Sequence, residues 1–191
     1  MGRPLRLIRL RLVQRRLGGT AGLALYGFLN GALSMAILAG LALYTGSPMI
    51  FPSLGPTAFL LFYTPLAASS SPRNTVYGHV IGAAAGWVSL ALFGLLDAPS
   101  FLTAGVTASR VGAAALSLGL TSGLMVLTRS AHPPAGATTL IVSLGLLSEP
   151  FELAVLIVAV LLLIVQALTI NRLAGIPYPL WRTTSADAPR K

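Results

Sequence analysis

The chain has 191 residues, of which 55% are apolar and only 9% are charged, and its formal net charge is +9. A soluble domain usually carries about 25% charged residues, so this composition indicates a membrane protein and argues against a soluble globule. Six of the thirteen basic residues lie within the first sixteen positions, which is typical of a cytoplasmic flank and argues against a nucleic-acid partner. The absence of cysteine excludes disulfides, thiolate metal sites and thiol catalysis.

In chain order, the sequence predicts a basic arm over residues 1–19, lying on anionic lipid, and then a single membrane domain over 20–171. Uncharged runs occur at 17–72, 74–96, 111–128, 130–148 and 153–171, and a crossing helix needs about 20 apolar residues. Together with their flanking residues, these runs predict long helices at 20–44, 74–96, 105–127 and 151–170. Two short helices are predicted between them, at 57–66 and after residue 138 to 147, and a polar cytoplasmic tail is predicted over 172–191.

Each predicted short helix follows a copy of the same motif, P-x-x-G-x-T. The first copy runs from Pro52 to Thr57, and the second runs from Pro133 to Thr138, 81 residues later. Proline and glycine break helices, and broken backbone at membrane depth is tolerated only where protein shields it or where it lines a cavity. A doubled break of this kind is typical of transporters that hold their solute near the midplane of the bilayer.

The charged residues between the helices distinguish six membrane passes from four. If the basic arm is cytoplasmic and each short helix completes a pass, the arginine-bearing loops lie inside and the acidic loops lie outside. Four passes would move Arg73 and Arg129 outside, so the positive-inside rule favours six. The expected fold is an all-α transmembrane protein with an inverted 3+3 repeat, one half at 20–96 and the other at 102–170. Arg110 then needs a partner within the membrane.

The two breaks also predict a substrate site without formal charge. A helix start leaves backbone N–H groups unpaired and carries a partial positive charge, so two starts that meet near the midplane suit a small anion. The prolines and glycines shape the approach, and the hydroxyls add donors. The residues predicted to bind substrate are Pro52, Ser53, Gly55, Thr57, His132, Pro133, Pro134, Gly136, Thr138 and Thr139. The residues predicted to support them are Arg73, Asn74, His79 and Ser130.

Each histidine has two interpretations. His132 either contacts the anion, attracting it and coupling transport to protons when the ring is charged, or caps backbone in a buried loop. For His79, interhelical hydrogen bonding is favoured over substrate contact. Glycines at helical spacing, such as the series at 78, 82 and 86, permit close packing, and packing within one protomer is favoured over a dimer seam. No carboxylate lies near either histidine in sequence and no metal-ligand spacing occurs, so the chain is not expected to be an enzyme or to need a cofactor.

Three stretches, in order along the chain, carry a resemblance to a known family. Residues 129–138 contain the His132-Pro133-Pro134 signature, and residues 52–62 and 71–79 provide two further motifs. The chain resembles the HPP family of integral membrane proteins over nearly all of 20–170. The resemblance implies a transporter, since some members are linked to nitrite uptake in chloroplasts and cyanobacteria, and it implies four spanning helices rather than six. Residues 54–57 read Leu-Gly-Pro-Thr where the family often has Phe-Gly-Ala-Ser, so the resemblance does not fix the solute.

The expected function is a membrane channel or transporter for a small inorganic anion, with nitrite as the named candidate. A bacterial inner membrane with both termini cytoplasmic is the expected location, and association with further copies of the chain is compatible with its glycine-rich faces. A neutral solute such as nitrous acid, ammonia or urea stays open, because helix dipoles also suit polar neutral groups. The alternative is a membrane anchoring or assembly module without transport activity, which the basic arm and the glycine faces favour.

Overall fold

The computed structural model describes residues 19–183, and the predicted basic arm lies almost entirely outside these residues. Within them the regular structure consists of seven α-helices and one 3₁₀ turn, with no strand. Four helices are long and apolar enough to cross a bilayer, as predicted. They are α2 (Gly19–Thr45), α4 (Pro72–Leu92), α6 (Ala108–Leu127) and α8 (Pro150–Leu173).

Two further helices, α3 (Leu54–Tyr63) and α7 (Ala135–Ser143), have ten and nine residues. At about 1.5 Å per residue, each covers about half of a hydrocarbon core about 30 Å thick. Both begin inside the repeated motif, 81 residues apart, so the predicted boundaries, which placed the helices after the motif, are wrong by three or four residues. The motif prolines allow this early start because the first turn of a helix has no partner for their missing N–H groups.

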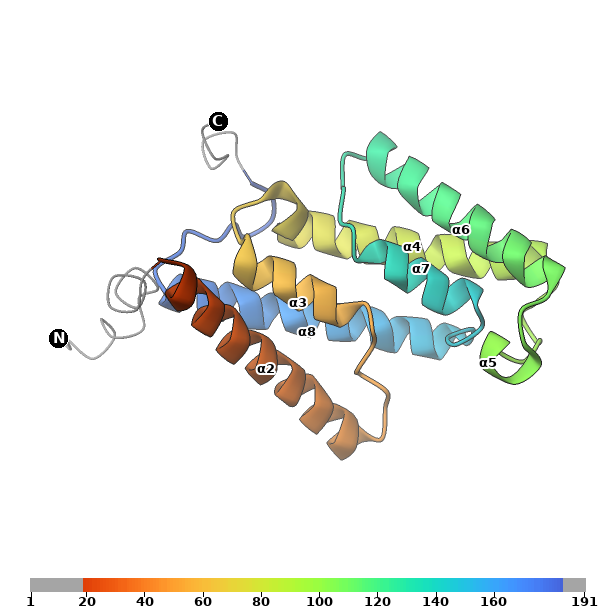
Figure 1. Ribbon diagram of the computed structural model, residues 1–191, viewed down its shortest axis with the longest axis horizontal. Helices are drawn as coiled ribbons and strands as arrows, with labels where there is room; N and C mark the ends of the chain where they lie inside the picture. Colours follow the sequence, from red (N-terminus) through yellow and green to blue (C-terminus); the bar gives the residue numbers. More distant parts are fainter. Residues whose placement is uncertain (1–18, 184–191) are drawn as a thin grey trace.

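Figure 1 shows how the long and short helices alternate in direction along the longest axis of the molecule. The chain passes from α2 back through α3, forward through α4, back through α6, forward through α7 and back through α8. The starts of α3 and α7 lie near the middle of this axis, and the two helices run from there toward opposite ends. Two smaller elements, η2 (Ala68–Ser70) and α5 (Phe101–Ala104), lie in the connections.

The long helices pack across the two halves of the sequence. α4 packs against α6 and α7, while α8 packs against α2 and α3. The close contact of α4 with α7 depends on Gly78, Gly82 and Gly86, where an added Cβ would lie 2.6–2.7 Å from atoms of the 132–142 segment. The prediction that this series serves packing within one protomer is confirmed. Gly27 and Gly119, by contrast, have no atom within 4 Å of an added Cβ.

Arg110 is the one arginine in the described residues that the protein buries, with 3% of its surface exposed. Its guanidinium donates to the carbonyl of Pro99 at 2.8 Å and to that of Ser143, the last residue of α7, at 3.3 Å. Gly145 leaves room for it, because a Cβ there would lie 2.9 Å from Nη1. The partner that the sequence required is therefore backbone carbonyl oxygen at a helix C-terminus, where a cation is favourable.

The described part of the predicted polar tail, residues 172–183, is mostly exposed but includes three buried residues, Ala174, Tyr178 and Pro179. Tyr178 is fully buried, and its hydroxyl donates to the carbonyl of Ser70 at 2.6 Å. Burial raises the pKa of Tyr178, so the hydroxyl remains a donor. The N–H of Arg73 donates to the carbonyl of Trp181 at 2.8 Å. This segment therefore holds η2 and the start of α4 in place.

Candidate functional site

A buried chain of four side chains joins the starts of the two short helices. The Oγ1 atom of Thr138 lies 2.7 Å from Nδ1 of His79, and Nε2 of His79 lies 3.0 Å from Oγ1 of Thr57. The same Thr57 oxygen lies 3.3 Å from Nε2 of His132, whose Nδ1 lies 2.7 Å from the carbonyl of Ser69. The four side chains have no exposed surface. We call them the histidine–threonine chain.

The local folding of each segment explains why these four side chains meet. Thr57 and Thr138 are each the fourth residue of a short helix, so both belong to the first turn, as predicted. His79 is the eighth residue of α4. It lies three and seven residues before Gly82 and Gly86, and therefore on the same face of the helix. Gly78 allows His132 to approach α4, because a Cβ there would lie 2.7 Å from Cβ of His132.

The hydrogen bonds of His79 and His132 bear on the two interpretations of each histidine. His79 makes the interhelical hydrogen bonds that the sequence favoured, from α4 to both α3 and α7. His132 bonds to a backbone carbonyl, as in the loop-capping interpretation, but its other nitrogen faces Thr57. The two rings lie 5.0 Å apart between centroids, so both belong to one buried cluster.

The backbone amides predicted to face an anion are mostly engaged by turns, and this part of the site prediction is wrong. At the start of α7, the N–H groups of residues 135–138 donate to the carbonyls of residues 132–134 at 3.0–3.3 Å. At the start of α3, Leu54 and Thr57 donate to the carbonyls of Phe51 and Ser53, and residue 56 is a proline. The turns preceding both helices satisfy the groups that a helix start otherwise leaves unpaired. The polar groups that meet between the helices are therefore side chains.

The predicted hydroxyls divide into three groups. Thr57 and Thr138 belong to the histidine–threonine chain. Ser53 and Thr139 are fully buried, and their hydroxyls have no hydrogen-bond partner among the described residues. Ser130 is also buried but pairs with the hydroxyl of Thr128 at 2.6 Å, away from the two histidines. Four more buried hydroxyls in the described residues also lack a partner, at Ser34, Ser89, Thr121 and Ser143. The lack of a partner therefore does not by itself mark Ser53 and Thr139 as solute positions.

The predicted prolines and glycines shape the helix starts without lining the cluster. Pro52 and Pro133 are exposed, whereas Pro134 is buried and forms the N-cap of α7. Gly55 and Gly136 are the second residues of their helices, two positions before the threonines. Residues two apart in an α-helix point in directions that differ by about 200°. The glycines therefore face away from the histidine–threonine chain, and the close approach of a solute to them stays a prediction.

An arginine-lined cavity of about 230 Å³ lies next to the loop that carries His132. Arg73 donates to the carbonyls of Thr128 and Arg129 at 3.0 and 2.9 Å, and the Asn74 amide donates to the carbonyl of Ala131 at 3.4 Å. Arg73 and Asn74, predicted as supporting residues, thus contact the loop that carries His132. The cavity is lined by Ala68, Ser71, Arg73, Asn74, Thr128, Arg129, Arg182 and Thr183.

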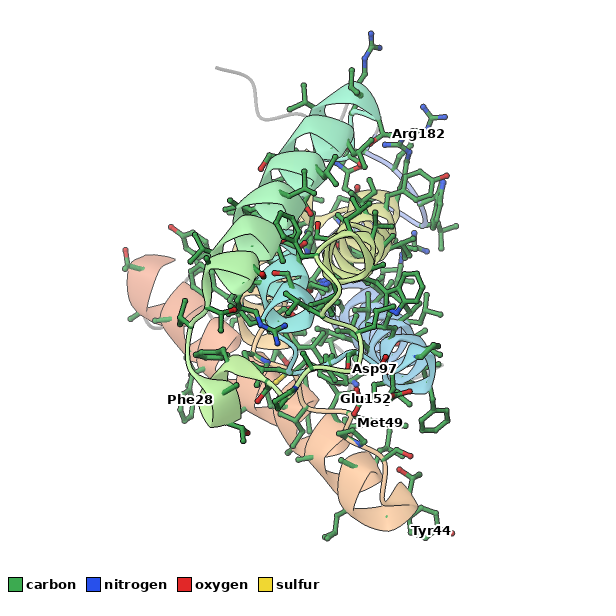
Figure 2. All side chains as sticks on the ribbon, turned by 90° about the vertical axis from the view of Figure 1, so that its right-hand side faces the viewer. Phe28, Tyr44, Met49, Asp97, Glu152 and Arg182 are labelled. Atoms are coloured by element: carbon green, nitrogen blue, oxygen red, sulfur yellow. The ribbon has the colours of Figure 1, made fainter. Side chains whose placement is uncertain are left out.

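Within residues 19–183, the acidic residues lie away from this cavity. Figure 2 views the end at which α4 finishes and α8 begins, and it shows Asp97 and Glu152 there. The hydrogen bonds of the arginines within residues 19–183 go to carbonyl oxygens and to one amide oxygen, not to carboxylates. The same residues include no group of three histidine, aspartate or glutamate side chains that could hold a metal ion. Within the described residues, the histidine–threonine chain therefore contains no acidic or basic partner, and the neighbouring cavity is lined by arginines.

Sequence reasoning missed three contributors to the site. Ser69 acts through its backbone carbonyl, for which no side-chain pattern exists. Arg182 and Tyr178 follow the last long helix, in a stretch interpreted as tail. The apolar residues Ile176 and Tyr178 were the available signal that this stretch packs against the protein.

Four long apolar helices and two half-length helices around a buried polar cluster define an all-helical integral membrane protein. The comparison with protein families identifies it more closely: residues 18–179 match the family described as HPP, transmembrane region, so the chain belongs to the HPP family. A protein from Dictyostelium discoideum, described only as a transmembrane protein, is 29% identical over 138 residues. This match covers 70% of the present chain and 45% of that relative, so the chain spans less than half of the relative's length. No solved structure matches the chain.

Proposed function

We propose that the protein is a membrane channel or transporter for a small inorganic anion, with nitrite as the first candidate. The observation that supports this function most directly is the buried histidine–threonine chain at the point where two half-length helices begin. Turns occupy the first amides of both short helices, but the aligned peptide dipoles of the two helices still direct their positive ends toward this region, which favours an anion over a cation. Arg73, Arg129 and Arg182 at the neighbouring cavity would raise the local concentration of anions.

We further propose that the two halves, α2–α4 and α6–α8, are inverted repeats and that the chain makes six traversals of the membrane. The equal 81-residue offset of the motifs and of the helix starts supports this arrangement, as do the opposite directions of α3 and α7 (Figure 1). In such proteins the solute site lies between the repeats near the midplane. The arginine-lined cavity would then face the cytoplasm in a bacterial plasma membrane, together with both termini.

The histidine–threonine chain also suggests how passage is controlled. All four ring nitrogens are within hydrogen-bond distance of protein atoms, so the cluster is closed in this structure. An anion that accepts hydrogen bonds from Thr57, Thr138 or the nearby unpaired hydroxyls would replace contacts between the side chains. Opening of the cluster and binding of the anion would then be the same event, without chemical change in the solute.

Uptake into liposomes tests this proposal. Vesicles containing the protein should accumulate nitrite faster than empty vesicles, and Thr57→Val or Thr138→Val should slow this uptake by about tenfold. A buried hydrogen-bond partner left unpaired costs about 1–3 kcal/mol, and about 1.4 kcal/mol corresponds to a factor of ten. Thr121→Val is the matched control, because its buried hydroxyl on α6 has no partner.

One result of the uptake assay would exclude anion transport. If neither nitrite nor any other monovalent anion enters faster than into empty vesicles, the chain is not an anion pathway. Recovery of a stoichiometric protein partner together with an absence of flux would instead support a membrane anchoring or assembly module.

A further inference from the structure

The hydrogen bonds of His132 determine which of its nitrogens carries hydrogen. A backbone carbonyl only accepts, so Nδ1 of His132 donates to the carbonyl of Ser69 at 2.7 Å. In the neutral ring the other nitrogen, Nε2, is then without hydrogen and acts as an acceptor. This nitrogen faces the hydroxyl of Thr57 at 3.3 Å.

The Thr57 hydroxyl has one hydrogen and three possible acceptors within reach. These are the carbonyl of Ser53 at 2.8 Å, Nε2 of His132 at 3.3 Å and, in one of the two tautomers of its ring, Nε2 of His79 at 3.0 Å. When the hydroxyl donates to His132, its oxygen accepts from Nε2 of His79, and Nδ1 of His79 accepts from Thr138. The neutral cluster is therefore fully satisfied, with every hydrogen bond pointing from Thr138 toward His132.

A proton added at Nε2 of His132 requires only a rotation of one hydroxyl. The Thr57 hydrogen turns to the carbonyl of Ser53, and the Thr57 oxygen accepts from both histidines, which uses its two lone pairs. No hydrogen bond is lost in this change. If Nδ1 of His79 were protonated instead, it would donate to the Thr138 oxygen. The Thr138 hydrogen would then have no acceptor, because the described hydrogen bonds offer the Thr138 hydroxyl no acceptor other than His79.

The groups around His132 do not stabilise a positive charge on its ring, so its protonated form needs an anion beside it. The titratable and charged groups around it are the ring of His79 on α4, Arg73 at the start of α4, Arg129 in its own loop, and Tyr178, which bonds to the carbonyl next to Ser69. All of these are neutral or positive, and the contacts of His132 from α3 and η2 are a hydroxyl and a carbonyl. A buried cation without a counter-ion is strongly unfavourable, and so is a buried lone anion.

We infer that His132 binds one proton together with one monovalent anion, so that the two cross the membrane as an electrically neutral pair. This inference rests on the proposed transport function and adds the co-transported ion. The proton passes from water on the entry side to Nε2 of His132 and returns to water with the anion on the other side. No bond within the anion forms or breaks.

Nitrite uptake by liposomes under imposed gradients distinguishes co-transport from passage of the anion alone. Uptake into empty vesicles is subtracted throughout, because undissociated nitrous acid crosses lipid unaided. With the membrane potential clamped at zero, an interior more alkaline by about one pH unit should drive about tenfold accumulation. At equal pH, an interior-positive potential of about 100 mV should drive none, whereas passage of the anion alone would give about fiftyfold accumulation. A dye for internal pH should report one proton per nitrite.

The possible results separate the two proposals. Protein-dependent uptake that follows voltage and ignores the pH gradient would overturn the proton inference and leave the transport function standing. An absence of nitrite uptake under both gradients would refute the transport function itself. These wild-type measurements decide the question without any variant.

Two variants then test the assignment to His132. In His132→Asn, the amide can still donate to the carbonyl of Ser69 but lacks the proton-accepting nitrogen, so the remaining uptake should follow voltage. In His79→Asn, uptake should be slower but should still follow the pH gradient. The reverse pattern, with pH dependence lost only in His79→Asn, would overturn the assignment.

Discussion

The contact between α4 and the loop of His132 makes Gly78→Ala a sensitive test of the site. The new Cβ would lie 2.7 Å from Cβ of His132 and 3.3 Å from Cβ of Ala135, whereas carbon atoms usually approach to about 3.5–4.0 Å. One side of the contact must therefore move by about 1 Å. The Thr57–His132 separation of 3.3 Å is already near the limit of a hydrogen bond, so it should break.

Extra volume in a packed interior costs about 1–3 kcal/mol, and displacement of a binding group by about 1 Å can reduce activity by about a hundredfold. We therefore expect nitrite uptake by Gly78→Ala to fall at least tenfold, with a lower unfolding temperature in detergent. Gly27→Ala makes the same chemical change on α2, where nothing lies within 4 Å, and should behave as wild type. Equal uptake by the two variants, at equal amounts of folded protein, would refute the role given to the α4 contact.

Three further predictions concern the frame around the site. Arg110→Met should lower the unfolding temperature, because the buried carbonyl of Ser143 loses a donor at a cost of about 1–3 kcal/mol; an unchanged temperature would contradict the capping role. Tyr178→Phe should destabilise by about 1 kcal/mol and expose the C-terminal segment to protease, and equal resistance to protease would show that this hydrogen bond does not hold the segment. A single cysteine at Asp97 should react with an impermeant thiol reagent added outside, and one at Thr128 should react only from inside. Thr45→Cys is the control for the outside face. If Asp97→Cys reacts from inside and Thr128→Cys from outside, the chain makes four passes.

The composition and the uncharged runs were enough to predict the long helices, because a bilayer requires about 20 apolar residues per crossing. The repeated motif likewise located the two short helices, since few other roles explain proline and glycine at membrane depth. Their boundaries were not predictable to the residue. Proline interrupts a helix interior but is accepted in a first turn, and only the turn geometry at Phe51–Ser53 and 132–134 distinguishes these cases.

The sequence indicated several residues of the buried cluster but not how they are connected. Thr57, Thr138 and His132 were expected to contact the solute and His79 to bond between helices, with further donors assigned to backbone amides. Whether a first-turn amide is free depends on the carbonyls of the residues before it, and sequence alone does not give their orientation. The meeting of His79 with both threonines depends on how α4 packs against the other half of the chain, which is a long-range contact.

The crossed packing of the two halves has a consequence for how the protein is made. α3 packs against both α2 and α8, and α8 begins about 90 residues later in the chain. At a synthesis rate of about 5–20 residues per second, α3 has α2 beside it but lacks α8 for several seconds. The packing of the first half is therefore completed only after the last long helix has been synthesised.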